Sequence, residues 1–120
     1  MQLSQLYRRG VVRPLDDDAA RELAAFRVAT PIRVEWLPIL GDDKFADLWA
    51  AGLFQQINKA CKIEISDYEE VELKAREVPK ALRVIDNMDC CSEEINAFVR
   101  HLRSLLADAA TSGRCVYFVF

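Results

Sequence analysis

Apolar residues recur at intervals of three and four along two stretches of the chain, and this spacing predicts two amphipathic helices. The first stretch, 45–60, indicates one continuous helix with Gly52 inside it, and we expect a backbone or an aromatic ring to approach this glycine closely. The second stretch begins after Ser92, a typical N-cap residue, and ends at Gly113, which suits the residue after a helix. Each helix should bury one face against a shared core.

Two further helices are predicted from the residues that start them. Residues 16–18 are three consecutive aspartates, which favour a helix beginning there because they cap its free N–H groups and complement its dipole. This helix should end near Ala29, because Pro31 disfavours helical geometry at the residue before it. Pro79 is compatible with a first helical turn, so we expect another helix over about 78–88.

The remaining pattern predicts strands. Residues 32–36 alternate apolar and polar side chains, as in a half-buried strand, whereas the six apolar or aromatic residues 115–120 indicate a central strand buried on both faces. Residues 62–78 fit either a helix or two strands joined through 67–70, and the proline that follows favours an extended or hairpin-like stretch. Residues 1–13 fit an extended or a short helical segment.

Length and composition favour one packed domain. At 120 residues, with 52 % hydrophobic and 29 % charged residues, the chain can bury a sizeable core without a disulfide or a metal. Combined with the expected elements, this predicts a single α+β domain over 1–120, with three or four helices packed on a small sheet that includes the C-terminal strand. The longest unbroken apolar stretch has seven residues, far short of a membrane-spanning helix, so no membrane association is expected.

The charges are unevenly distributed along the chain. Sixteen basic and nineteen acidic residues give a net charge of −3, which argues against a general nucleic-acid binder. Residues 41–80 carry this whole charge, and the run 64–72 contains five carboxylates, no basic residue and Tyr68. Such an acidic, aromatic surface favours a basic protein partner, while a solvated face that keeps the protein soluble is the alternative.

Residues with catalytic or metal-binding chemistry are few. The aspartates at 16–18 and 42–43 are explained by helix starts rather than by a metal site. His101 is the only histidine, and an enzyme that pairs it with a cysteine is one alternative hypothesis. Four cysteines match neither zinc spacing nor a disulfide framework, and no secretory signal precedes them, so we expect reduced thiols, a cytoplasmic location and no metal or cofactor: Cys61, Cys90, Cys91 and Cys115.

Four segments between 45 and 120 carry a family resemblance: Leu53-Phe54-x-x-Ile57-Asn58, Ile65-Ser66-Asp67-Tyr68-Glu69-Glu70, Val78-Pro79-Lys80-Ala81-Leu82, and the helix leading to Gly113 with the strand 116–120. In these segments the chain resembles small bacterial immunity proteins of polymorphic-toxin and contact-dependent-inhibition systems. The resemblance implies a non-enzymatic protein that binds and blocks a cognate toxin, commonly a nuclease, with Asp67, Tyr68, Glu69 and Glu70 as contacts. Residues 1–44 lie outside the resemblance.

We therefore predict a non-enzymatic, cytosolic binding protein, an immunity- or antitoxin-like inhibitor that occludes a basic site on a cognate toxin. Its partner-binding residues are expected in the acidic run: Glu64, Asp67, Tyr68, Glu69, Glu70 and Glu72. The alternative is a structural or regulatory domain that self-associates, for example as a homodimer, through an apolar helix face or the strand edge 36–40. Neither nucleic acid nor a membrane is expected as a partner.

Overall fold

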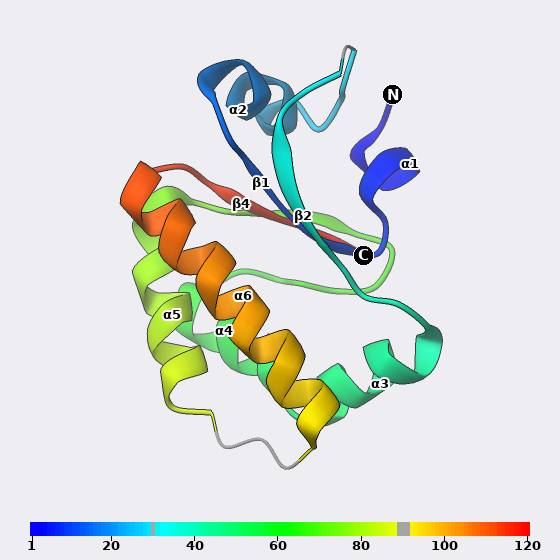
Figure 1. The fold of residues 1–120 in the computed structure, drawn as a ribbon, viewed down its shortest axis with the longest axis vertical. Helices are drawn as coiled ribbons and strands as arrows, with labels where there is room; N and C mark the ends of the chain where they lie inside the picture. Colours follow the sequence, from blue (N-terminus) through cyan, green and yellow to red (C-terminus); the bar gives the residue numbers. More distant parts are fainter. Residues whose placement is uncertain (30, 89–91) are drawn as a thin grey trace.

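The chain folds into one α+β domain built on a four-stranded antiparallel sheet (Figure 1), which confirms the predicted fold class. The computed structural model describes residues 1–29, 31–88 and 92–120. The strands lie in the order β2-β1-β4-β3, so β2 and β3 are the edges. Their bounds are β1 (Gly10–Pro14), β2 (Val34–Pro38), β3 (Glu70–Leu73) and β4 (Val116–Val119).

Helices cover both faces of the sheet. The described residues form six α-helices, where the sequence pattern indicated three or four: α1 (Leu3–Tyr7), α2 (Asp17–Ala24), α3 (Asp42–Ala50), α4 (Leu53–Cys61), α5 (Val78–Asp86) and α6 (Glu93–Ser112). A 3-10 turn, η1 (Ala75–Glu77), leads into α5. Helices α3 to α6 pack on one face of the sheet and form the larger core, whereas α1 and α2 cover part of the other face.

The C-terminal strand β4 lies between β1 and β3, as predicted for a strand that is buried on both faces. Its side chains alternate between the two cores. Phe118 and Phe120 point to the helical face, where both rings pack against Phe54. Tyr117 and Val119 point to the opposite face and pack with residues of α1 and α2. This strand therefore belongs to both cores at once.

The cap residues place the long helix α6 as the sequence predicts. The Ser92 hydroxyl accepts a hydrogen bond from the Ile95 N–H at 3.1 Å, and Gly113 ends the helix with a left-handed φ of 69°. Helix α5 also begins where expected, with Pro79 in its first turn. At the N-terminus the two alternatives for 1–13 are both realised, because a short helix precedes β1.

The predicted helix over 45–60 is wrong, because the chain breaks there into α3 and α4. Gly52 adopts a φ of 84°, which is left-handed and ends the first helix. The expected close approach is also wrong: a Cβ added at Gly52 would meet only the side-chain amide of Gln56, at 3.5 Å. The glycine is there for its backbone conformation, not for packing.

Other boundaries also differ from the prediction: β4 is Val116–Val119 rather than 115–120, and α5 ends at Asp86 rather than near 88. Helix α2 ends at Ala24 rather than near Ala29, since Phe26 has a φ of 56° and the Val28 N–H donates to the Met1 carbonyl at 2.7 Å instead of continuing the helix. The strand expected at 32–36 is β2, which begins and ends two residues later.

The ambiguous segment 62–78 forms neither one helix nor a hairpin: among the described residues it contributes a single strand, β3, followed by η1. The side chain of Asn58 explains why the residues before β3 do not pair with it. Its amide donates to the Ile65 carbonyl at 3.1 Å and its oxygen accepts from the Ile65 N–H at 2.7 Å. This segment is thereby tied to α4, and only β3 joins the sheet.

Replacing Gly52 tests whether conformation alone holds the break between α3 and α4. We expect Gly52→Ala to lower the free energy of unfolding by about 1 kcal/mol, because alanine is strained at positive φ. Gly52→Asn should lose clearly less, because asparagine tolerates the left-handed region. Urea denaturation of both variants measures the difference. Equal losses would instead point to steric crowding at this position.

Candidate functional site

The alternation of side chains along β3 sends two of the predicted contact residues to the face that carries α1. The Glu70 carboxylate accepts a hydrogen bond from the Ser4 N–H at 2.8 Å. The Glu72 carboxylate accepts one from the Tyr117 hydroxyl at 3.1 Å. Burial, and after it the charge of Glu72, raises the pKa of Tyr117, so this hydroxyl stays protonated and remains a donor. Both carboxylates thus join β3 to the rest of the fold.

Asp67 is held by two arginines from the segment between α1 and β1. The Arg9 guanidinium donates to Asp67 at 3.2 Å and to Asp42 at 2.8 Å, and it lies 3.8 Å from the centre of the Phe45 ring. Burial acts to lower the pKa of Arg9, but hydrogen bonds and charges from the two aspartates outweigh it and raise that pKa. Arg8 also approaches Asp67, at 3.7 Å. Arg9 therefore stays positively charged, and it contacts the acidic run through Asp67.

Residues 67–69, which we name the Tyr68 loop, hold an aromatic side chain out in solvent. Tyr68 has a left-handed φ of 63°, and its N–H donates to the Asp67 carboxylate at 3.0 Å. Its side chain is 78 % exposed, and the Arg8 guanidinium lies 4.6 Å from the ring centre. The Arg8 Nε in turn donates to the Phe120 main-chain oxygen at 2.6 Å, and the Phe120 N–H donates to the Glu69 carbonyl at 3.0 Å. The loop is fixed at both ends.

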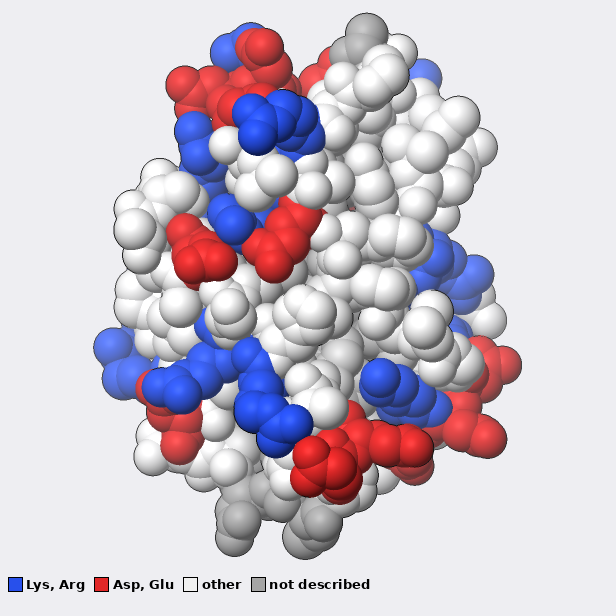
Figure 2. All heavy atoms as spheres, in the orientation of Figure 1, with Lys and Arg blue, Asp and Glu red and all other residues white. Residues whose placement is uncertain are grey.

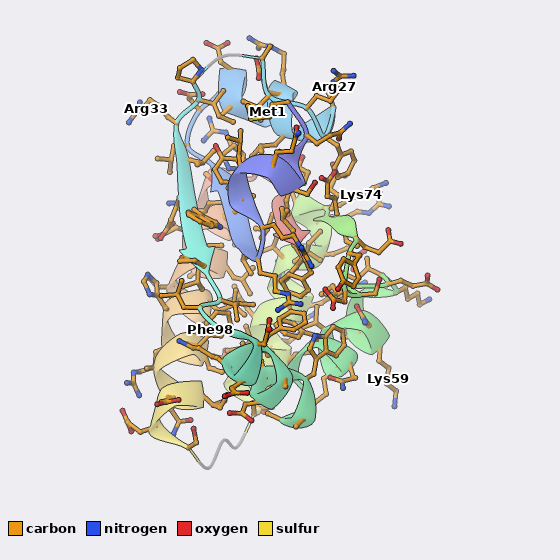
Figure 3. All side chains as sticks on the ribbon, turned by 90° about the vertical axis from the view of Figure 1, so that its right-hand side faces the viewer. Met1, Arg27, Arg33, Lys59, Lys74 and Phe98 are labelled. Atoms are coloured by element: carbon orange, nitrogen blue, oxygen red, sulfur yellow. The ribbon has the colours of Figure 1, made fainter. Side chains whose placement is uncertain are left out.

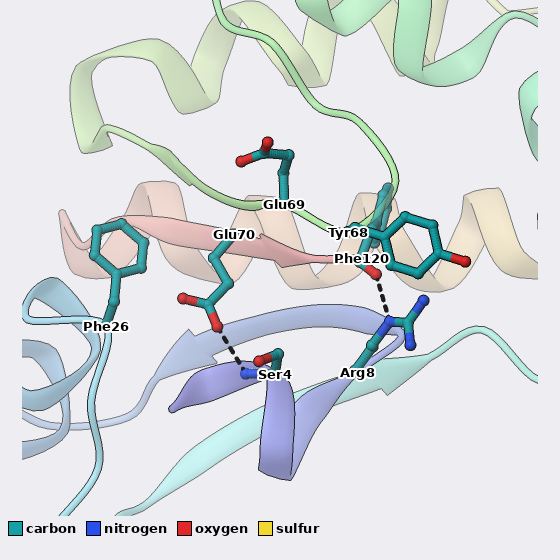
Figure 4. Close-up of a pocket in the computed structure, with 7 residues that line it drawn as sticks. All are labelled: Ser4, Arg8, Phe26, Tyr68, Glu69, Glu70 and Phe120. Carbon is teal, nitrogen blue, oxygen red and sulfur yellow. Dashed lines mark hydrogen bonds between the residues drawn. The ribbon is translucent and has the colours of Figure 1, made fainter. Parts of the chain in front are cut away.

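Two hollows flank the Tyr68 loop. One has a volume of about 560 Å³ and is lined by Ser4, Arg8, Phe26, Tyr68, Glu69, Glu70 and Phe120 (Figure 4). The other, of about 420 Å³, is lined by Arg8, Arg9, Ile39, Gly41, Asp42 and Tyr68. Arg8 and Tyr68 belong to both linings, so this stacked pair forms the ridge between them.

The acidic run does not form a surface of one sign. Asp67, Glu70 and Glu72 are engaged with partners inside the protein, whereas the side chains of Glu64 and Glu69 are exposed and make no ion pair or hydrogen bond within the described ranges. Figure 2 shows the same mixing on the face that carries α2 and α6, where acidic and basic side chains lie next to each other. Sequence reasoning missed Arg8 and Arg9, because they lie 58 or more residues away from Asp67 along the chain and no local pattern connects them.

No hydrogen bond joins His101 to Cys61 or Cys115 in the described part of the chain. His101 is exposed on α6. Cys61 is buried, and burial followed by the charge of Glu77 raises the pKa of its thiol, which disfavours a nucleophilic thiolate. Residues 1–29, 31–88 and 92–120 contain no group of three histidine, cysteine or acidic side chains that could hold a metal ion. Cys90 and Cys91 lie outside the described residues.

No family model matches the chain, and no curated protein or solved structure matches it either. Of the helices that the described residues form, none is long and apolar enough to cross a membrane.

A pair of alanine substitutions tests the internal role of Asp67. We expect Asp67→Ala to lower the free energy of unfolding by about 1 kcal/mol, because it removes partly exposed ionic contacts to two arginines and the hydrogen bond to the Tyr68 N–H. The matched change Glu69→Ala, at an exposed carboxylate without such contacts, should stay within about 0.5 kcal/mol of the wild type. Chemical denaturation measures both, and equal stabilities would show that Asp67 does not fix the loop.

Proposed function

We propose that the chain is a non-enzymatic binding protein, an immunity- or antitoxin-like inhibitor that covers a basic site on a cognate protein toxin. The observation that carries the proposal is the Tyr68 loop, in which a large aromatic side chain is held 78 % exposed on a fixed backbone. Exposed aromatic residues on rigid supports are typical centres of protein interfaces, because little entropy is lost when a partner covers them.

The contacts of the acidic run divide the predicted binding residues into two groups. Tyr68, Glu69 and Glu64 project from the protein and are the residues that we expect to touch the partner. Asp67, Glu70 and Glu72 have internal partners and position the others. Because arginines partly balance the carboxylates, binding should depend on burial of Tyr68 more than on net charge, and so only moderately on salt.

Other classes of function have less support. The raised pKa of the buried Cys61 thiol and the exposed position of His101 favour a binding protein over a cysteine enzyme. The net charge of −3 favours a protein partner, with a nuclease as one candidate, over nucleic acid. A cytoplasmic location and the absence of a cofactor belong to the same proposal. Self-association is the second candidate, and the position of β2 at an edge of the sheet favours it.

Coexpression with the toxin tests the proposal. The chain is produced together with the C-terminal domain of a toxin encoded beside its own gene, and growth and complex formation are measured. We expect the wild type to protect the cells and bind the toxin domain. Tyr68→Ala should weaken binding by about 2 kcal/mol or more, roughly thirtyfold, and reduce protection. Glu64→Lys combined with Glu69→Lys should weaken binding as well, mostly through slower association.

The control is Glu94→Lys, a charge reversal at an exposed site on α6, which should bind as the wild type does. Thermal unfolding of each variant shows that the fold is retained. A gene neighbourhood without a toxin, a toxin domain that the chain does not bind, or a Tyr68→Ala variant with unchanged affinity would each contradict the proposal.

A further inference from the structure

The outer edge of β2 carries main-chain groups that have no partner among the described residues. Residues of odd number bond to β1: the Leu15 N–H donates to the Arg33 carbonyl and the Ile39 N–H to the Arg9 carbonyl, both at 2.9 Å. The register that pairs Val12 with Trp36 continues this alternation. The N–H and C=O groups of Val34 and Trp36 therefore point away from the sheet, where they can bond to another strand.

The sequence of this edge is complementary to itself when two copies run antiparallel around Val34. In that register Arg33 lies opposite Glu35 of the second copy, and the two-fold axis repeats the pair. Ile32 lies opposite Trp36 of the second copy, and Val34 meets Val34. Opposite charges and apolar side chains placed directly across from each other are the pairs that stabilise sheets. A register centred on Glu35 would instead oppose two glutamates, and one centred on Trp36 would use Pro38, which has no N–H.

The charged pair is available for such a contact. Arg33 is exposed and makes no ion pair in the part of the chain that the structure describes. Figure 3 shows it projecting from the end of β2, away from the body of the protein. Glu35 receives a hydrogen bond from Arg13 on one carboxylate oxygen, Oε1, which leaves the other oxygen for a second arginine. An ion pair across the edge would thus add to the internal one without replacing it.

The side chains of the neighbouring surface are mostly apolar. Trp36 is 41 % exposed, packs edge-on against Tyr7 with ring centres 5.8 Å apart, and donates its indole N–H to the Tyr7 carbonyl at 3.0 Å. Beside it is a hollow of about 520 Å³ lined by Met1, Leu6, Tyr7, Val28, Ala29, Pro31 and Ile32. In Figure 2 the surface at the upper right, over α1 and the N-terminus, consists mostly of uncharged residues. The side chains of this lining carry no charge, and the Met1 ammonium group is bound to the Val28 carbonyl at 3.0 Å, so the hollow matches an identical, mostly apolar surface.

We propose that two copies of this chain associate through β2, in antiparallel register about Val34, and so join their sheets into one of eight strands. The two-fold axis gives each copy the same contacts, as in most homodimers. This surface is distinct from the Tyr68 loop, so the proposal stands independently of the toxin-binding function.

Sedimentation equilibrium over a range of concentrations tests the dimer. We expect the wild type to show a reversible monomer–dimer equilibrium. Arg33→Glu should raise the dissociation constant about tenfold or more, because it places two carboxylates opposite each other at two symmetric positions. Lys59→Glu is the matched control: it makes the same change of charge on α4, at the other side of the molecule in Figure 3, and should leave the equilibrium unchanged.

A mixture of two variants identifies the register. The Glu35→Lys variant alone should form a weaker dimer, as the Arg33→Glu variant does. The introduced lysine would lie opposite Arg33 of the second copy, so that two cations face each other. An equal mixture of Arg33→Glu and Glu35→Lys should dimerise again, since each introduced charge then faces its opposite on the other copy. The comparison of Arg33→Glu with Lys59→Glu stands even if Glu35→Lys, which loses its contact with Arg13, proves unstable.

Three results would overturn the proposal. One is a wild type that remains monomeric at every concentration, and another is a dimer that Arg33→Glu does not weaken. The third is a mixture of two folded variants that does not recover the dimer. Tyr68→Ala should dimerise as the wild type does, which separates a failure here from a failure of the proposed toxin binding.

Discussion

The burial of β4 on both faces is the constraint on which the rest of the structure depends. A strand whose side chains alternate between two apolar surroundings needs a core on each side, and here Phe118 and Phe120 serve one core while Tyr117 and Val119 serve the other. The larger core is closed by α3 to α6. The smaller one can close only with the N-terminal segment, because Leu3, Val12, Leu23 and Val28 supply its other buried side chains. The two ends of the sequence are thereby brought together.

The site follows from this meeting of the ends. Because β4 pairs with both β1 and β3, the residues just before β1 and those just before β3 lie at the same end of the sheet as Phe120. Arg8 then reaches both the Phe120 main chain and the Tyr68 ring, and Arg9 reaches Asp67. The exposed tyrosine is thus supported by contacts between segments that are more than fifty residues apart, and these contacts exist only in the folded protein.

These contacts also explain which features the sequence could predict. The α+β class, helix α6 with its caps at Ser92 and Gly113, and the central strand β4 follow from local patterns and were predicted correctly. The break at Gly52 was missed because apolar spacing continues across it, and only a positive φ distinguishes two helices from one. The candidate site was predicted as a run of acids, whereas its charge balance depends on Arg8 and Arg9, whose approach is a tertiary event.

The two edge strands, β2 and β3, differ in how their charged side chains affect pairing with a second copy. On β3 the side chains Glu70 and Glu72 carry charges of one sign, and a second copy of this edge would oppose like charges, so the strand is protected against self-pairing. At β2 the charged residues are Arg33, which directly precedes the strand, and Glu35; they have opposite signs and are two positions apart. Charges normally protect an edge strand, but in this arrangement an antiparallel copy turns each of them into half of an ion pair. Charged side chains therefore oppose self-pairing of β3 but favour self-pairing of β2.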